Sequence, residues 1–196
     1  AFALLFSAQL ISTTGDVIAS VAVPFAILGL GGGAGDIGLV LAARAVPLVL
    51  FLLVGGVWAD RLPRRTVMIA SDAVRAACEA LFAILLFTGT GGVRAIAAIM
   101  FVYGAAEAFF RPALSGVVPQ AVGPERLQEA YGLIAITPAT GMVLGGVLGG
   151  TIVATISPAG AITFDAASFV IGITLLAFAR FRHVATAERG RAFLDD

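Results

Sequence analysis

Long apolar runs, separated by short polar or glycine- and proline-rich breaks, dominate the chain. The runs lie near residues 2–29, 37–59, 66–88, 93–115, 127–156 and 159–180. A helix needs about 20 mostly apolar residues to cross the hydrocarbon core of a bilayer, and each run is long enough. Strands of a membrane barrel are short and alternate in polarity, whereas these runs are apolar on all sides. The pattern predicts an all-α membrane protein in which residues 1–181 form a bundle of six transmembrane helices.

The composition also indicates a lipid environment. Hydrophobic residues make up 60% of the chain, charged residues make up 12%, and the mean hydropathy is +1.05. A soluble domain is about half apolar and about a quarter charged. The sequence gives no sign of a nucleic-acid surface, and its single cysteine, Cys78, excludes an intrachain disulfide and a paired-thiol metal site. We expect no metal and no cofactor.

The arginines predict how the bundle is oriented. If successive breaks alternate between the two sides of the membrane, one side carries Arg61, Arg64, Arg65, Arg111, Arg126, Arg180, Arg182, Arg189 and Arg191. The other side carries Arg94. By the positive-inside rule both termini face the cytoplasm, so we expect a multi-pass protein of the cytoplasmic (inner) membrane. The polar residues 182–196 are expected to form a cytoplasmic tail or the start of an interdomain linker.

A charged turn follows the second apolar run, and its chemistry suits contact with a helix end. Gly56 lies one turn before Asp60, which allows another helix to come close. The Asp60 carboxylate can then meet the positive N-terminus of that helix or an arginine. Arg61, Arg64 and Arg65 suit interfacial carboxylates and lipid headgroups. The alternative is a positively charged membrane anchor in which Asp60 is incidental.

The pattern Gly56-x-x-x-Asp60-Arg61-x-x-Arg64-Arg65, placed between the second and third of six helices, resembles the signature loop of the major facilitator superfamily. Pro63 stands where that motif usually has glycine. The segments 15–16, 41–47, 72–76, 110–113 and 127–130 resemble the branch that contains bacterial macrolide and siderophore exporters. The resemblance implies an amino-terminal six-helix half in which these motif residues form a gating loop. It also implies a second six-helix half, either in the same chain beyond residue 196 or in another subunit.

Ionisable residues inside the apolar runs are costly in lipid, so each is a candidate for function. Asp16, near the middle of the first run, is the leading candidate for a proton or substrate-cation site, with a structural hydrogen bond to a helix end as the alternative. Arg44, Glu107 and Asp165 are further candidates. Arg44 and Asp165 are opposite in sign and lie on segments that can meet. Arg111 follows Glu107 by one turn, which favours an internal pair.

The third run carries Asp72, Arg75 and Glu79 at spacings of three and four. This spacing places them on one face of a helix, where Arg75 can pair with either acid. Pairing lowers the cost of burying the charges, so we expect a structural or gating ion pair.

The fifth run is rich in glycines spaced four apart. They form two overlapping series, Gly141, Gly145 and Gly149 in one and Gly146 and Gly150 in the other. Such spacing makes a smooth surface for close helix packing in lipid. The stretch also resembles the antiporter motif of the superfamily, which implies export by exchange, with Gly146 where that motif has proline.

The leading interpretation is a secondary active transporter that exports an amphipathic small organic molecule, such as a drug or siderophore. The resemblance implies proton coupling and alternating access between two halves. One alternative is a membrane interaction subunit that transports nothing. An intramembrane hydrolase built on Ser115 is less favoured, because the sole histidine, His183, lies in the tail. We therefore expect a transporter and not an enzyme, with the lipid bilayer, a substrate and protons as its partners.

Overall fold

The computed structural model is built from long helices, which confirms the all-α class. It describes residues 1–179 and 181, without the side chains of residues 53–61, so the predicted tail, 182–196, lies outside the described residues. The helices in this part of the chain are α1 (Phe2–Gly29), α2 (Ala34–Arg61), α3 (Arg64–Thr88), α4 (Val93–Ala121), α5 (Leu127–Thr155) and α6 (Pro158–Phe178). A short 3-10 helix, η1 (Pro124–Arg126), precedes α5.

Five of the helical segments are long and apolar enough to cross a membrane. They are Phe2–Gly29, Ala34–Leu52, Val93–Ala121, Pro124–Thr155 and Pro158–Phe178. The helix α3 does not belong to this set, because Asp72, Arg75 and Glu79 occupy its middle turns. The structure therefore contains a helix for each predicted span, and composition alone marks five of them as membrane spans.

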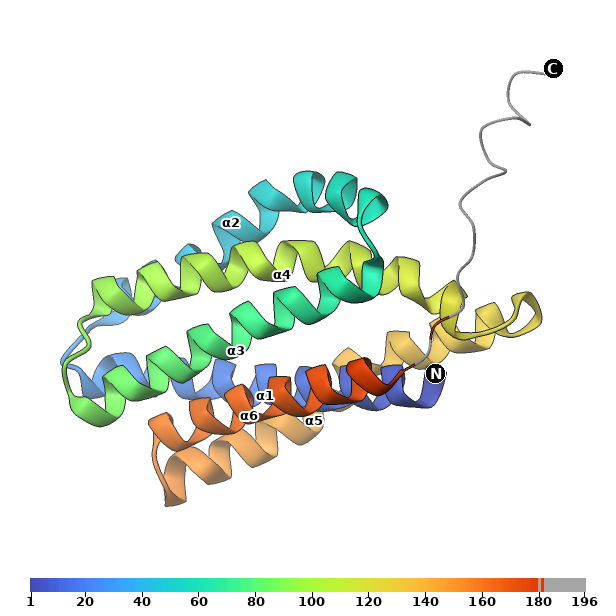
Figure 1. Cartoon of the computed structure of the whole chain (residues 1–196). Coiled ribbons are helices and arrows are strands. Elements are labelled where there is room, and N and C mark those ends of the chain that lie inside the picture. The colour runs from blue at the N-terminus through green and yellow to red at the C-terminus, as the bar shows by residue number, and fades with distance from the viewer. Residues whose placement is uncertain (180, 182–196) are drawn as a thin grey trace.

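The helices form two groups that α3 and α6 connect (Figure 1). The helix α1 packs against α5 and α6, while α4 packs against α2 and α3. If the chain is divided into α1–α3 and α4–α6, the first helix of each half packs against the second and third helices of the other half. This is the packing expected of two three-helix repeats, an organisation that recurs in membrane transporters.

The turns fall at two opposite ends of the bundle (Figure 1). The N-terminus, the α2–α3 turn, the α4–α5 turn and the end of α6 lie at one end, which we call the terminal end. The other three turns lie at the opposite end. There Ser157 caps α6, since its Oγ accepts a hydrogen bond from Gly160 N at 3.0 Å. Gly89 ends α3 with a φ of +65°, in the left-handed region that glycine adopts readily.

Two apolar clusters fill the interior, one toward each end. The cluster toward the opposite end includes Ile18, Ile27, Phe82, Ile96 and Phe169. The cluster toward the terminal end includes Leu5, Met68, Phe110, Val117 and Leu176. Asp16, Asp72 and Glu107 each fall between members of the two clusters along their own helices. A charged layer therefore separates the two apolar clusters.

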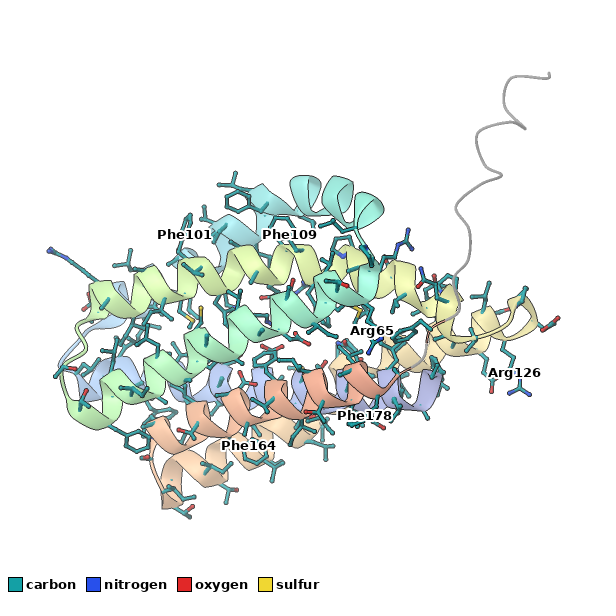
Figure 2. All side chains as sticks on the ribbon, viewed as in Figure 1. Arg65, Phe101, Phe109, Arg126, Phe164 and Phe178 are labelled. Atoms are coloured by element: carbon teal, nitrogen blue, oxygen red, sulfur yellow. The ribbon has the colours of Figure 1, made fainter. Side chains whose placement is uncertain are left out.

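Large apolar side chains also cover the outside of the bundle. Figure 2 shows Phe101 projecting outward from α4, and Phe164 and Phe178 doing so from α6. Large exposed apolar surfaces are normally covered by lipid or by another protein. For helices of membrane-spanning length, that cover is lipid.

Candidate functional site

Arg75 of α3 is the centre of a cluster of charged side chains at the middle of the bundle. Its side chain is 3% exposed. Its Nη2 donates to Asp16 Oδ2 on α1 at 2.7 Å and to the Tyr103 hydroxyl on α4 at 2.9 Å. Its Nη1 donates to Asp72 Oδ1, one turn earlier on α3, at 3.2 Å. One guanidinium group therefore connects α1, α3 and α4.

Arg44 of α2 approaches the other oxygen of Asp16. Its Nη2 lies 3.4 Å from Asp16 Oδ1. Its Nε and Nη2 lie 3.1 and 3.0 Å from Glu107 Oε2 on α4. Arg111, one turn after Glu107, donates from Nη2 to Glu107 Oε1 at 2.6 Å. Asp16 and Glu107 are thus each shared between two arginines, so neither carboxylate carries an uncompensated charge.

Tyr103 lies outside the set of candidates that the sequence indicates, yet it is a central member of the cluster. Its hydroxyl donates to Asp16 Oδ1 while it accepts from Arg75. The Arg75 guanidinium also lies 4.9 Å from the centre of the Tyr103 ring and 4.2 Å from that of Phe169 on α6. Aromatic faces stabilise a cation that has lost its water. The sequence feature that could have indicated Tyr103 is its position four residues before Glu107, which places both side chains on the same helix face.

The cluster has a buried side and an open side. Asp72, Arg75, Glu79 and Asp165, on α3 and α6, are buried. By contrast, the side chains of Arg44 and Asp16 are 26% and 22% exposed, and that of Arg111 is 60% exposed. A ligand approaching the face formed by α1, α2 and α4 would therefore meet Asp16 and Arg44, while Arg75 supports Asp16 from behind.

Glu79 and Asp165 have no arginine partner within the described part of the chain. Asp165 Oδ1 accepts a hydrogen bond from Ser168 Oγ at 3.0 Å, while Asp165 Oδ2 and Glu79 Oε2 are buried without a partner. The sequence allowed Arg75 to pair with either acid on its helix and Arg44 to meet Asp165. In the structure Arg75 binds Asp72, and Arg44 binds Asp16 and Glu107. In the described part of the chain, Asp16, Asp72 and Glu107 therefore have arginine partners, whereas Glu79 and Asp165 do not.

Two glycines allow the helices to come close at the level of the cluster. A Cβ atom at Gly15 of α1 would overlap Asp165 Oδ1 and Ser168 Oγ of α6. A Cβ atom at Gly104 of α4 would overlap the backbone oxygen of Arg44 on α2. The absence of a side chain at these positions therefore helps to place Asp165 beside α1 and Arg44 beside α4.

The two glycine series of α5 face in different directions. Gly141, Gly145 and Gly149 pack against α1, and a Cβ atom at Gly145 would lie 2.6 Å from the nearest atom of that helix. Gly146 and Gly150 lie on another face, where an added Cβ would meet no described atom within 4 Å. The first series therefore packs within the bundle, and the second leaves a smooth strip of α5 on its surface.

Arg65, in the first turn of α3, reaches across the terminal end of the bundle to α6 (Figure 2). Its Nε donates to the backbone oxygen of Leu176 at 2.9 Å, and its Nη2 donates to that of Ala177. The last carbonyls of a helix have no partner within the helix and attract cations. Arg65 therefore caps the C-terminal end of α6.

The rest of the predicted gating loop is only partly described. The Arg64 guanidinium lies against Gly116 of α4, where a Cβ atom would overlap it. The side chains of Asp60 and Arg61, together with the surroundings of Gly56, lie outside the described residues. The contacts of Arg64 and Arg65 show that the start of α3 is anchored to both α4 and α6.

Comparison with known proteins assigns the family. Residues 1–191 match the family of major facilitator superfamily (MFS) proteins described as transmembrane secretion effector. The chain belongs to the major facilitator superfamily. This confirms the family expected from the charged turn, and membership of this family points to a transporter rather than an enzyme.

Several members of this superfamily are similar to the chain over most of its length. The MFS-type transporter YkuC of Bacillus subtilis is 30% identical over 96% of this chain and 44% of its own length. The multidrug efflux pump Tap of Mycobacterium tuberculosis is 30% identical over 91% of this chain and 43% of its own. The enterobactin exporter EntS of Citrobacter koseri is 30% identical over 79% of this chain and 37% of its own. The chain therefore spans less than half the length of these relatives.

Proposed function

We propose that this chain is the amino-terminal half of a secondary active transporter that exports an amphipathic small organic molecule, such as a drug or siderophore, in exchange for protons. The observation that carries the proposal is the position of Asp16. This acid lies in the middle of a membrane-length helix, is partly open to one face, and is held between Arg44 and Arg75 on two other helices. Charges at membrane depth typically mark the pathway of a substrate or ion.

The contacts of Asp16 suit a group whose partners change during transport. A cationic substrate or a proton that reaches Asp16 weakens its attraction to Arg44 and Arg75. Arg44 lies on α2 and Arg75 on α3, so α2 and α3 then lose ion pairs that connect them to α1. Such a change in helix contacts, repeated in a second six-helix half, is the kind of step that alternating access requires. The names of Tap and EntS support drugs and siderophores as the cargo class.

We place all six helices across the cytoplasmic membrane, with both termini in the cytoplasm. The helix α3 is suited to be the sixth span, because Asp72, Arg75 and Glu79 are buried in the bundle and need not face lipid. The arginine distribution supports the orientation. An impermeant thiol reagent should label the variant Arg94→Cys from outside intact cells and leave Arg126→Cys unlabelled. The reverse result would contradict the orientation.

The second half packs against this one, either as the continuation of the chain or as another subunit. The loop of Gly56, Asp60, Arg61, Arg64 and Arg65 gates the cytoplasmic side of the pathway. The anchoring of Arg64 and Arg65 to α4 and α6 supports this role, because movement of the loop would be passed on to both helices.

The experiment that tests the function uses inverted membrane vesicles that contain the full-length protein. An imposed proton gradient should drive accumulation of ethidium, an amphipathic cation, and accumulation should fall to the background of empty vesicles in the variant Asp16→Asn. The control is Glu125→Gln, at an exposed acid of η1. Accumulation by Asp16→Asn at the wild-type rate would remove Asp16 from the mechanism. If no substrate moved with the wild-type protein, a non-transporting membrane subunit would be favoured.

A further inference from the structure

Glu79 of α3 and Asp165 of α6 are the two acids of the central cluster that the arginine contacts leave out. Glu79 is 2% exposed, and Asp165 is 0% exposed. Each has one carboxyl oxygen that is buried and without a hydrogen-bond partner. The helices α3 and α6 pack directly against each other, and Asp165 lies within electrostatic range of Glu79. The cluster therefore contains two buried acids, on adjacent helices, that it does not neutralise.

The surroundings of the two acids come from five helices. Asp165 lies against Gly15 of α1 and accepts a hydrogen bond from Ser168 on its own helix. It is within electrostatic range of Asp16 on α1 and of Arg75 and Glu79 on α3. Glu79 is within electrostatic range of Asp16, Arg44 and Arg75, and its neighbour in sequence is Cys78. Tyr103 of α4 lies within electrostatic range of Asp165. Its ring packs on that of Phe169, which follows Asp165 by one turn of α6. Among these groups Arg44 and Arg75 are the cations, and both are bound to other carboxylates.

The charges of the cluster do not balance if every acid is ionised. The described acids are Asp16, Asp72, Glu79, Glu107 and Asp165, and the arginines that bind the cluster are Arg44, Arg75 and Arg111. Two negative charges remain uncompensated, and the two acids without an arginine are the most buried acids other than Asp72. An unpaired carboxylate is far more costly to bury in an apolar interior than a neutral carboxylic acid. The favourable state is therefore one in which Glu79 and Asp165 each hold a proton.

We propose that Glu79 and Asp165 form a buried proton-holding site behind Asp16, and that loss of a proton from this site transfers Arg75 from Asp16 to Glu79. This inference rests on the proposed function, since it assigns the protons that drive export. In the step itself a proton leaves the carboxylic acid for water, and the negative charge stays on the carboxylate. The balance of charge requires no other reactant.

The geometry of Arg75 suits this transfer. Glu79 follows Arg75 by four residues on α3, the spacing at which an arginine and an acid meet on one helix face. Arg75 Nε is buried and without a partner, while Nη1 and Nη2 are occupied. An ionised Glu79 would therefore attract a guanidinium that already lies one helical turn away. Asp16, which faces the open side of the cluster, would then lose its 2.7 Å contact and become available to a cationic substrate.

Infrared spectroscopy of the purified full-length protein in lipid tests the site without relying on transport. At neutral pH the wild-type spectrum minus that of the variant Glu79→Gln or Asp165→Asn should contain the carbonyl band of a protonated carboxylic acid. Both substitutions imitate the protonated side chain, so the variants should keep the wild-type melting temperature. The matched controls are Glu107→Gln, which removes an arginine-paired acid, and Glu125→Gln, which removes an exposed acid. Neither control difference spectrum should contain the band.

Absence of the band from both difference spectra would overturn the proposal. A band that disappears when sodium chloride is added at constant pH would also overturn it, because the site would then hold a cation in place of protons. In vesicles, both variants imitate the protonated site and therefore keep Arg75 on Asp16, so both should lose proton-driven accumulation of ethidium. If the wild-type protein showed the band but transported no ethidium, the proposed function alone would be contradicted. If it transported ethidium in exchange for protons but showed no band, this inference alone would be contradicted.

Discussion

Arg75 of α3 and Asp16 of α1 form the shortest ion pair between the two helix groups in the described part of the chain, with Arg75 Nη2 2.7 Å from Asp16 Oδ2. The helix α1 packs against α5 and α6, whereas α3 packs against α4 and α6. The pair therefore joins helices that belong to different groups. Because Arg75 is buried and Asp16 is partly exposed, a change on the open face is passed directly to the interior.

Loss of the Asp16 carboxylate should destabilise the bundle. In the variant Asp16→Asn, Arg75 keeps Asp72 and Tyr103 as partners but loses its shortest charged contact, and Arg44 keeps Glu107. Because some partners remain, we expect the free energy of unfolding to fall by about 1–3 kcal/mol, short of the cost of a fully orphaned charge. Thermal melting in detergent measures the change, with Glu125→Gln, at an exposed acid of η1, as the control. Equal melting temperatures for Asp16→Asn and wild type would contradict the central role of the pair.

The Tyr103 hydroxyl should contribute to stability separately from its ring. The variant Tyr103→Phe removes the donor to Asp16 and the acceptor for Arg75 but keeps the ring on which the guanidinium lies. We expect a loss of about 1–3 kcal/mol, and a larger loss for Tyr103→Leu, which also removes the cation–π contact. The control Tyr131→Phe removes a hydroxyl that bonds an exposed backbone oxygen and should have little effect. Similar losses at both tyrosines would show that burial at the cluster is irrelevant.

Removal of the Arg65 side chain should loosen the end of α6. In Arg65→Ala the backbone oxygens of Leu176 and Ala177, in the last turn of α6, lose their donor. We expect faster hydrogen exchange over the last turn of α6, with little change in α1. The control Arg126→Ala removes an exposed arginine at the same end of the bundle. If exchange in α6 were identical in the two variants, the capping role would be wrong.

Adjacent glycines of α5 should respond in opposite ways to the same substitution. A Cβ at Gly145 would lie 2.6 Å from an atom of α1, so Gly145→Ala forces the two helices apart and should cost about 1–3 kcal/mol. Gly146→Ala meets open space in the described chain and should be neutral or stabilising by up to about 1 kcal/mol, because alanine is the better helix former. Thermal melting of the two variants measures the difference. A lower melting temperature for Gly146→Ala than for Gly145→Ala would contradict the packing of α5 on α1.

The sequence predicts the helical class and the family because both depend on local features. Apolar runs of span length indicate helices without any knowledge of their neighbours. The charged turn that ends in Arg64 and Arg65 is a contiguous motif. The pair of Glu107 and Arg111 is likewise local, since both lie on one helix at a spacing that brings them together.

The partners of Asp16 and Arg44 are not predictable in the same way. Their contacts depend on which helices are neighbours and on how each helix is rotated about its axis. Small residues such as Gly15 and Gly104 set the close approaches, and apolar runs that are hydrophobic on all sides do not reveal which face is inward. For the same reason Asp165 lies against Gly15 of α1, while the described ion pairs of Arg44 are with Asp16 and Glu107.

The most direct test of the account is substrate-induced proton movement in proteoliposomes that contain the full-length protein. With no gradient imposed at the start, ethidium added on one side should be carried across in exchange for protons, and a pH-sensitive dye inside the vesicles should report a proton flux that Asp16→Asn abolishes. Ethidium transport by the wild-type protein with no accompanying proton flux would contradict a proton-coupled exporter built around Asp16.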